Sequence, residues 1–136
     1  MTDPTEKWRQ AYRDMQAALL DSGALDEAAL RDRRGDADLD TTQAWVLQQG
    51  TALLAVDGPN GVVYPAFQFT AAGDVRVELA PHVATLQDAR VEPWIAWRWL
   101  TEPESLLSGE IPQEVMVTDP RRAAIATERY AEQQRF

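Results

Sequence analysis

The chain has 136 residues, of which 45% are hydrophobic and 26% charged, and its formal net charge at pH 7 is −9. This length predicts one domain or two very small ones, and the acidic balance disfavours nucleic-acid binding, which depends on neutralising phosphates. The absence of cysteine excludes disulfides and thiolate metal sites, and one histidine, His82, is too few for a histidine-based metal site or a typical catalytic triad.

An apolar stripe runs through residues 5–22 and predicts a helix that ends at Gly23. The stripe recurs at spacings of three or four residues and consists of Trp8, Tyr12, Met15 and Leu19. We expect it to pack against the core of the same chain, as such stripes usually do. The alternative is a seam for a dimer or for another partner.

Two short helices are predicted next. Residues 25–34 carry acidic side chains early and arginines late, an order that complements the helix dipole. Residues 40–49 form the second of these helices, with Asp38 or Asp40 as the N-cap and Gly50 at the end.

A β-hairpin is predicted in the middle of the chain. Residues 51–56, TALLAV, and 62–67, VVYPAF, have the composition of strands and flank a turn of sequence DGPNG. The hairpin therefore covers residues 51–67, with a loop of about five residues. Residues 73–79 alternate apolar and polar side chains and predict a third short strand.

The aromatic residues Tyr64, Phe67 and Phe69 surround Pro65 where the second strand ends. Proline lacks a backbone donor, so Pro65 predicts the end of an edge strand. We expect Phe67 and Phe69 to fill a cleft between the hairpin and the C-terminal helices. Burial of each phenylalanine there contributes roughly 1.5–3 kcal/mol to stability.

Four more helices are predicted, at residues 80–89, 92–101, 111–117 and 119–133. His82 lies in the first of them and is expected to be partly exposed. The order of elements predicts a mainly α fold with a small β-hairpin. Residues 1–72 have the outline of a winged helix-turn-helix, and residues 73–136 are expected to form a small C-terminal helical bundle.

Two patches in the C-terminal half are candidates for binding another protein. Trp97 and Arg98 are expected to point outward, because the tryptophans of residues 92–101 cannot all face one side of a helix. The alternative is that Trp97 packs on the N-terminal helix of the same chain. The second patch is the cationic last helix and tail, with Arg121, Arg122, Arg129, Tyr130 and Phe136. For this segment the alternative is a frayed chain end.

The string YPAFQF, followed by the tryptophan helix and by a spaced Leu, Gly and Pro, resembles the Xre/MbcA/ParS-type antitoxins of bacterial toxin–antitoxin modules. The resemblance covers roughly residues 40–130. The matching positions are Tyr64, Pro65, Phe67, Gln68, Phe69, Trp94, Trp99, Leu100, Leu107, Gly109 and Pro112.

This resemblance implies a C-terminal helical domain that binds a cognate toxin with a RES domain, an enzyme that consumes NAD. The antitoxin is expected to cover the active-site entrance of that toxin. The resemblance also implies a homodimer, and an N-terminal helix-turn-helix that often represses its own operon.

Sequence-specific DNA binding is disfavoured by the residues themselves, because residues 40–75 carry no Lys or Arg. Amide side chains can read adenine, and Gln43 and Gln48 are the candidates for base contacts. Phosphate contacts need basic side chains, which only the preceding helix supplies, at Arg31, Arg33 and Arg34. A solvated helix end neutralised by nearby aspartates is the alternative for these arginines.

The residues do not indicate catalytic chemistry. No carboxylate pair stands in an apolar setting that would raise a pKa, and DGPNG lacks the lysine and following helix of a phosphate cradle. We therefore expect a binding protein without metal or cofactor, not an enzyme. The alternatives are a winged-helix transcriptional regulator that binds DNA and a homodimeric interaction module without a toxin partner.

The expected location is the cytoplasm, without membrane contact. No apolar run approaches the ~20 residues of a membrane span, and the first residues lack the apolar core of a signal peptide.

Overall fold

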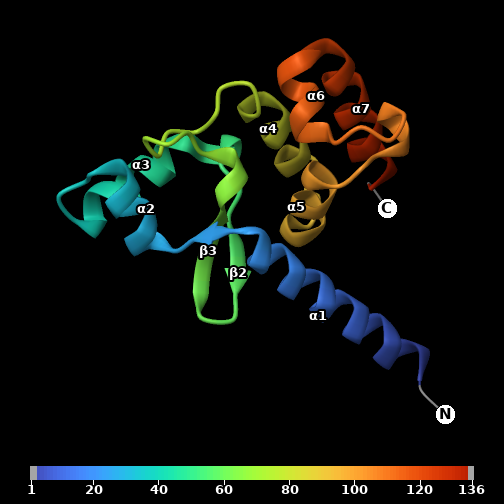
Figure 1. Ribbon diagram of the computed structural model, residues 1–136, viewed down its shortest axis with the longest axis horizontal. Helices are drawn as coiled ribbons and strands as arrows, with labels where there is room; N and C mark the ends of the chain where they lie inside the picture. The colour runs from blue at the N-terminus through green and yellow to red at the C-terminus, as the bar shows by residue number, and fades with distance from the viewer. Residues whose placement is uncertain (1–2, 135–136) are drawn as a thin grey trace.

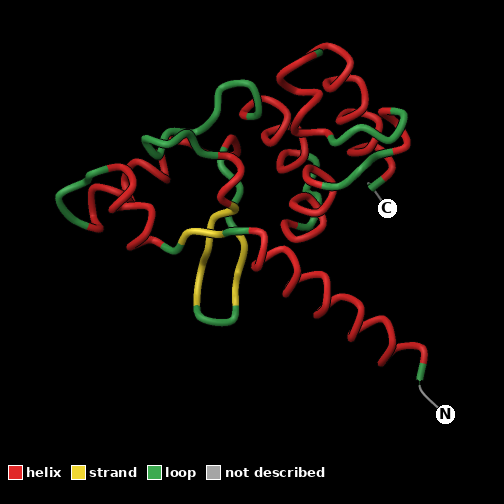
Figure 2. The backbone as a smooth tube through the Cα atoms, viewed as in Figure 1, coloured by secondary structure: helices red, strands yellow, loops and turns green. Residues whose placement is uncertain are grey.

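The computed structural model describes residues 3–134 and shows a mainly helical fold with a small antiparallel sheet (Figures 1 and 2). The α-helices in this part of the chain are α1 (Pro4–Ser22), α2 (Glu27–Arg34), α3 (Leu39–Gln49), α4 (Ala80–Asp88), α5 (Pro93–Thr101), α6 (Pro112–Thr118) and α7 (Pro120–Gln133). The strands are β1 (Ala24–Leu25), β2 (Val56–Gly58) and β3 (Gly61–Pro65). Short 3-10 turns lie at Gly50–Ala52, Ala66–Gln68 and Ser105–Leu107. None of these helices is both long and apolar enough to cross a bilayer.

Acidic side chains cap the starts of α1, α2, α3, α5 and α7, and the cap of α3 is one of the two that the sequence predicts. Asp38 accepts hydrogen bonds from the backbone N–H and the hydroxyl of Thr41, at 2.8 and 2.7 Å, and these bonds hold the pKa of Asp38 below its usual value. Asp119 accepts from the N–H of Arg122 at the start of α7. The first-turn N–H groups have no partner within the helix, so these caps fix where each helix begins.

The sheet has the strand order β1-β3-β2, with both pairs antiparallel. Tyr64 in β3 pairs with Leu25 in β1, and Val63 in β3 pairs with Val56 in β2. The predicted hairpin is confirmed between β2 and β3, but its connection is tighter than five residues because Gly58 pairs directly with Gly61.

The strand predicted at residues 51–56 is wrong over most of its length. The chain forms a 3-10 turn at Gly50–Ala52, and β2 begins only at Val56. Leu53 and Leu54 between them are buried on different sides, each in its own hydrophobic cluster. The backbone N–H and C=O of Leu54 bond to the side chain of Gln68, and the C=O of Leu53 accepts from the side chain of Gln87, in place of bonds to a neighbouring strand. The periodicity of the sequence carries no signal for such bonds.

The third strand predicted at residues 73–79 is also wrong, since the third strand of the sheet is β1. In this segment only Val75 makes an isolated bridge, with Phe69. Val77 is 78% exposed, so the alternation of apolar residues does not correspond to a buried face.

The core has two hydrophobic clusters. The larger one joins the C-terminal end of α1 and the start of β2 to α4, α5, α6 and α7, and Trp97, Leu86 and Leu100 are fully buried in it. The smaller cluster consists of Leu30, Leu53, Tyr64 and Phe69. The larger cluster takes residues from both sides of position 72, and the predicted division of the chain there remains a prediction.

The two phenylalanines of the aromatic string separate into these clusters. Phe69 is buried in the smaller cluster, with its ring centroid 6.5 Å from that of Trp45 in α3. Phe67 packs, partly buried, against the larger cluster. The prediction that both fill one cleft is therefore wrong: Phe67 lies within the 3-10 turn Ala66–Gln68, Phe69 follows it, and the two side chains pack in different clusters.

The helix α1 extends from the body, and its N-terminal end lies far from the other helices (Figure 1). Leu19 near its C-terminal end is buried, whereas Trp8 is 66% exposed and stacks on Tyr12 with 5.4 Å between ring centroids. The expected packing of the apolar stripe on the core is confirmed for Leu19 and for Tyr12 and Met15, which are partly buried against the larger cluster, but not for Trp8.

Candidate functional site

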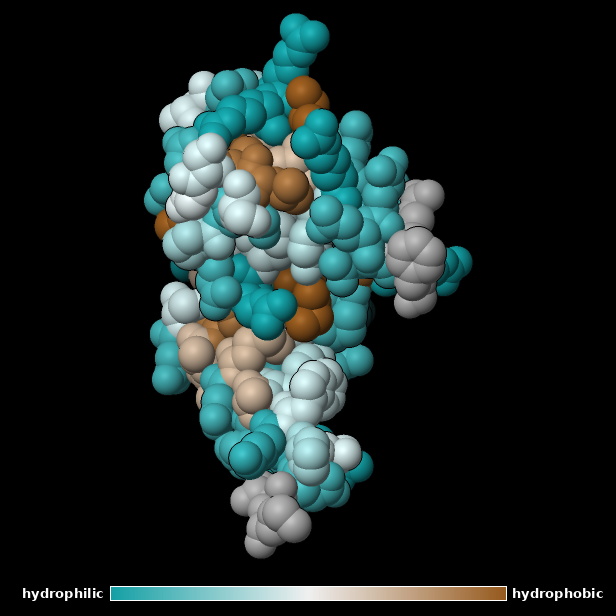
Figure 3. Space-filling model, turned by 90° about the vertical axis from the view of Figure 1, so that its right-hand side faces the viewer, coloured by the Kyte–Doolittle hydropathy of each residue, from teal (hydrophilic) through white to brown (hydrophobic). Residues whose placement is uncertain are grey.

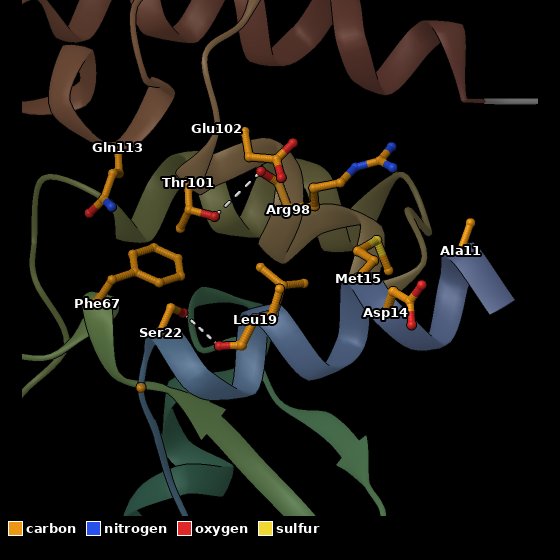
Figure 4. Close-up of a pocket in the computed structure, with 12 residues that line it drawn as sticks. Ala11, Asp14, Met15, Leu19, Ser22, Phe67, Arg98, Thr101, Glu102 and Gln113 are labelled. Carbon is orange, nitrogen blue, oxygen red and sulfur yellow. Dashed lines mark hydrogen bonds between the residues drawn. The ribbon is translucent and has the colours of Figure 1, made fainter.

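A groove of about 750 Å³ is bounded by α1, α5 and the start of α6. Its floor is apolar and contains Met15, Leu19 and Phe67, which face Arg98 and Glu102 across the opening (Figure 4). An open groove with an apolar floor and charged rim is suited to a protein segment, because side chains can be buried along the floor while backbone and charges stay at the rim.

Local sequence explains why α1 forms one wall of this groove. Small side chains at Ala11 and Ala18 line the wall beside Met15, so another chain could approach the helix closely. Gly23 ends α1 with a φ of 124°, a value that glycine adopts easily, and the chain then turns into β1. The N–H of Ala66 donates to the carbonyl of Gly23, and this bond keeps the end of α1 beside Phe67.

Arg98 on α5 joins the groove to two smaller hollows. One, of about 210 Å³, lies toward the exposed start of α1 and is lined by Trp8, Tyr12 and Ile95. The other, of about 180 Å³, lies on the side of Tyr130. The prediction that Arg98 is exposed is confirmed, and its position makes it the common rim of all three hollows.

Tyr130 in α7 is half-buried and stacks on Trp99, with ring centroids 4.8 Å apart. Burial raises the pKa of Tyr130 above its ordinary value, the Arg98 guanidinium beside it acts in the opposite direction, and the Glu104 carboxylate raises it further. The stack of Tyr130 on Trp99 therefore joins α7 to α5, and only part of the Tyr130 side chain is exposed to a partner.

An exposed face of α7 combines arginines with an apolar centre. Arg121, Ile125 and Arg129 recur at intervals of four residues, and all three are exposed, Ile125 by 49%. Such spacing places them along one side of the helix. Neither Arg121 nor Arg129 forms an ion pair within residues 3–134, whereas Arg122 is paired with Glu110. We call Arg121, Ile125 and Arg129 the cationic face of α7.

The prediction that Trp97 points outward is wrong. Trp97 is fully buried in the larger cluster, and its ring stacks on that of Trp94 at 5.5 Å. Other helices contact α5 on several sides, because α1, α4 and α6 all pack against it. A helix surrounded in this way buries tryptophans on several faces, so spacing along the sequence could not identify an outward one. Phe136, the last predicted contact, lies outside the described residues.

The arginines predicted to contact phosphates differ in how far they are engaged. Arg34 is not available: it pairs with Asp36 and Asp74 at 3.1 Å, donates to the carbonyl of Gly73, and its guanidinium carbon lies 3.7 Å from the ring centroid of Trp45. These contacts hold the loop before α4 against α2 and α3. Of the other two, Arg31 bonds the adjacent Asp32, and Arg33 is exposed.

The glutamines predicted to read bases are both exposed on α3. The Gln43 amide donates to the Glu27 carboxylate on α2 at 3.0 Å, whereas Gln48 has no side-chain hydrogen bond among the described residues. Of the five predicted DNA contacts, only Arg33 and Gln48 are exposed and without a side-chain partner among the described residues. The five side chains therefore do not form one basic surface.

The titratable side chains are dispersed. Within residues 3–134 no three His, Asp or Glu side chains are arranged to hold a metal ion. His82 lies in α4 as predicted but is buried, not partly exposed, and burial lowers its pKa below the ordinary value.

The exposed first half of α1 is the feature that sequence reasoning missed. The stripe of Trp8, Tyr12 and Met15 has the spacing of a core-facing helix, and nothing in the spacing shows that the body ends between Tyr12, which packs against the larger cluster, and Trp8. The available signal was charge, since Lys7, Arg9 and Arg13 flank the aromatic residues in an otherwise acidic chain.

Comparisons with known proteins give no match: no family model, no curated protein and no solved structure is significantly similar to this chain.

Proposed function

We propose that this chain is an antitoxin-like binding protein, which neutralises a RES-type, NAD-consuming toxin by covering the entrance to its active site. The observation that carries the proposal is the cationic face of α7, which is exposed in a chain of net charge −9. Arginine beside an apolar side chain is a typical composition of binding hot spots. An acidic surface on the toxin is the complementary partner, and opposite charge would also speed the encounter.

The residues that carry the family resemblance have structural roles in this fold. Tyr64, Pro65, Gln68 and Phe69 of the aromatic string are buried where the hairpin meets the helices. Gly109 has a φ of 85°, a conformation that disfavours other residues, at the turn before α6. The antitoxin family and the partner that it implies are part of the proposal.

A co-expression experiment tests this function. The protein encoded by the neighbouring gene is expressed in bacteria with or without this chain, and cellular NAD, growth and co-purification are measured; a neighbour that does not lower NAD would also count against the proposal. We expect the chain to restore NAD and growth and to co-purify in a fixed ratio. Loss of NAD despite equal expression of the chain would contradict the proposal.

Matched charge reversals then locate the interface. The double variant Arg121→Glu with Arg129→Glu is expected to lose protection, because it inverts the cationic face of α7. The control, Arg9→Glu with Arg33→Glu, makes the same change in net charge at exposed sites on α1 and α2 and is expected to keep it. Equal protection by both double variants would exclude α7 as the binding surface.

A second candidate function is DNA binding as a winged-helix regulator. One observation favours it: the elements follow the order α1, β1, α2, α3, β2, β3, with β1 beside β3, which is the arrangement expected of a winged helix. In such a fold α3 would enter the major groove. The engagement of Arg34 and the acidic composition of the chain weigh against this candidate.

A gel-shift assay with the chain's own promoter at low salt decides this second candidate. Specific binding predicts a shifted band that weakens as salt rises, and weakens again in the variant Arg33→Glu. The control Arg9→Glu makes the same change in charge at an exposed site on α1, away from α2 and α3, and is expected to leave the shift unchanged. No shift at low salt, or a shift equal for any DNA, would count against the regulator.

A further inference from the structure

Another hollow, of about 440 Å³, lies where α1, the turn of the β2–β3 hairpin and the start of α5 meet. Figure 1 shows α1 and this hairpin diverging from the same region of the fold. Most of the surface inside the hollow is apolar, and only a few polar groups reach it, which is the usual composition of a site for one small molecule. We call it the hairpin hollow; its lining includes Arg13, Ala17, Leu20, Asp57, Pro59 and Trp94.

The hairpin hollow and the groove lie on opposite sides of α1. Successive residues of a helix are turned by about 100°, so Arg13, Ala17 and Leu20 gather on one side of α1. The groove residues Ala11 and Ala18 fall on the other side. The described lining of the hairpin hollow also includes no residue of α7. The site is therefore separate from the surfaces discussed above and does not depend on the proposed toxin binding.

Trp94 gives the hairpin hollow an aromatic floor. This tryptophan is only 5% exposed, its ring stacks on that of Trp97 with 5.5 Å between centroids, and Leu20 lies beside it in the lining. On the face toward which α1 projects, hydrophilic side chains cover most of the surface and apolar ones appear in small, separate patches (Figure 3). An apolar floor of this limited extent can bury one large side chain, whereas a wide protein interface would need more area.

Two opposite charges border this floor from different walls. Arg13 lies on α1 and Asp57 on β2, both are exposed, and neither forms an ion pair within residues 3–134. The Arg13 guanidinium donates one hydrogen bond to Oε1 of Gln10 at 2.8 Å, which leaves its other N–H groups for a ligand. The hollow therefore offers a cationic donor and an anionic acceptor beside an apolar floor.

We propose that the hairpin hollow binds a free amino acid with a large apolar side chain, such as phenylalanine or leucine. The carboxylate of the ligand accepts from the Arg13 guanidinium, and its ammonium donates to the Asp57 carboxylate. Its side chain lies against Leu20 and Trp94. An α-amino acid carries both charges at neutral pH, and hydrogen bonds between charged groups are stronger than those between neutral ones.

Charge selects a zwitterion over other small molecules. The net charge of −9 disfavours an anion throughout the surroundings of the chain, and Arg13 disfavours a cation at the hollow itself. A zwitterion has no net charge and presents the opposite sign to each of the two walls. A ligand without an apolar side chain would leave the floor at Leu20 and Trp94 in contact with water, so the side chain contributes affinity through burial.

Nuclear magnetic resonance of the tryptophan indole N–H groups tests the site in the full-length chain. The Trp94 signal is identified by sequential resonance assignment, and L-phenylalanine is added in steps. We expect this signal to shift until the site is saturated. N-acetyl-phenylalanine and phenylalanine amide each lack one of the two charges and are expected to bind about tenfold more weakly. Glycine keeps both charges but has no side chain to cover the floor, and it is expected to cause no saturable shift.

Substitutions on the two walls make the test specific to this site. Arg13→Gln and Asp57→Asn each remove one charge and are expected to raise the dissociation constant for L-phenylalanine by about tenfold. Arg33→Gln and Asp40→Asn remove the same charges on α2 and α3 and are expected to leave it unchanged. All four side chains are exposed, so circular dichroism is expected to be the same for every variant. No saturable shift with L-phenylalanine or L-leucine at millimolar concentration, equally tight binding of either analogue, or equal effects of the site and control variants would overturn the proposal.

Discussion

The side-chain amide of Gln68 pairs with the backbone of Leu54 as a neighbouring strand would. The N–H of Leu54 donates to Oε1 of Gln68 at 2.8 Å, and Nε2 of Gln68 donates to the carbonyl of Leu54 at 2.8 Å. The same Nε2 also donates to the carbonyl of Pro65 at 3.1 Å. Gln68 is completely buried, so these bonds hold the chain where it passes between the two hydrophobic clusters.

Removing this amide is predicted to destabilise the fold strongly. Gln68→Met keeps the length of the side chain but leaves two backbone carbonyls and one N–H buried without partners. Each such group costs about 1–3 kcal/mol, and we expect the free energy of unfolding to fall by about 3–5 kcal/mol in urea denaturation. Gln48→Met, on the exposed side of α3, is the control and is expected to change stability little. A loss below about 1 kcal/mol in Gln68→Met would show that water replaces the amide.

This amide also shows where sequence reasoning stops. Helix positions were predictable because caps such as Asp38 and Asp119 and ends such as Gly50 act within a few residues. The backbone at Leu54 is instead satisfied by a side chain 14 residues away, and its strand-like composition was misleading. Long-range polar contacts of this kind leave no periodic signal.

The candidate site was predictable to a similar extent. Exposure of Arg98, Arg121 and Arg129 follows from their charge and was anticipated. Burial of Trp97 and exposure of Trp8 depend on which helices pack on α5 and where the body ends along α1. These are properties of the assembled fold, and apolar spacing alone is the same for a covered face and an uncovered one.

A second prediction concerns the contacts that join the loop before α4 to α2 and α3. Arg34→Met removes the ion pairs with Asp36 and Asp74 and leaves the mostly buried Asp36 carboxylate without its cation. Breaking a largely buried pair in this way is expected to lower the free energy of unfolding by about 2–4 kcal/mol. Arg33→Met removes an exposed arginine from the same helix and serves as the control in urea denaturation.

The close approach of Gly73 to Arg34 gives a third prediction. A methyl group at Gly73 would meet the Arg34 side chain and backbone, and the φ of this glycine is +82°. Gly73→Ala therefore combines a steric clash with backbone strain. Gly35→Ala is the matched control, because φ is +73° there but nothing lies within 4 Å, so only the strain of about 1–2 kcal/mol remains. We expect Gly73→Ala to lower the melting temperature more than Gly35→Ala, and equal effects would contradict the clash.

Tyr12 provides a prediction about pH. Burial, together with the neighbouring Glu92 carboxylate, raises the pKa of Tyr12 from 10.0 to about 12. Because the folded state keeps the proton longer than the unfolded chain, the associated stability is fully present below pH 10.0 and is lost as the pH rises toward 12. Nuclear magnetic resonance of labelled tyrosine rings can follow this titration. Glu92→Gln is expected to lower the pKa of Tyr12 while leaving the contribution of burial, and Glu114→Gln on α6 is expected to leave it unchanged.

Two neighbouring tryptophans on α5 are predicted to respond differently to the same substitution. The indole Nε1 of Trp99 is a buried side-chain atom without a hydrogen-bond partner among the described residues, and its ring stacks on Tyr130. Trp99→Phe removes that unsatisfied donor and retains an aromatic ring for the stack, so the cost of the smaller side chain is partly offset. Trp97→Phe has no such compensation, because Trp97 is completely buried and the smaller ring leaves a cavity. We expect losses of about 2–3 kcal/mol for Trp97→Phe and below about 1 kcal/mol for Trp99→Phe in urea denaturation. The reverse order would mean that Trp99 carries more of the packing than its unpaired donor costs.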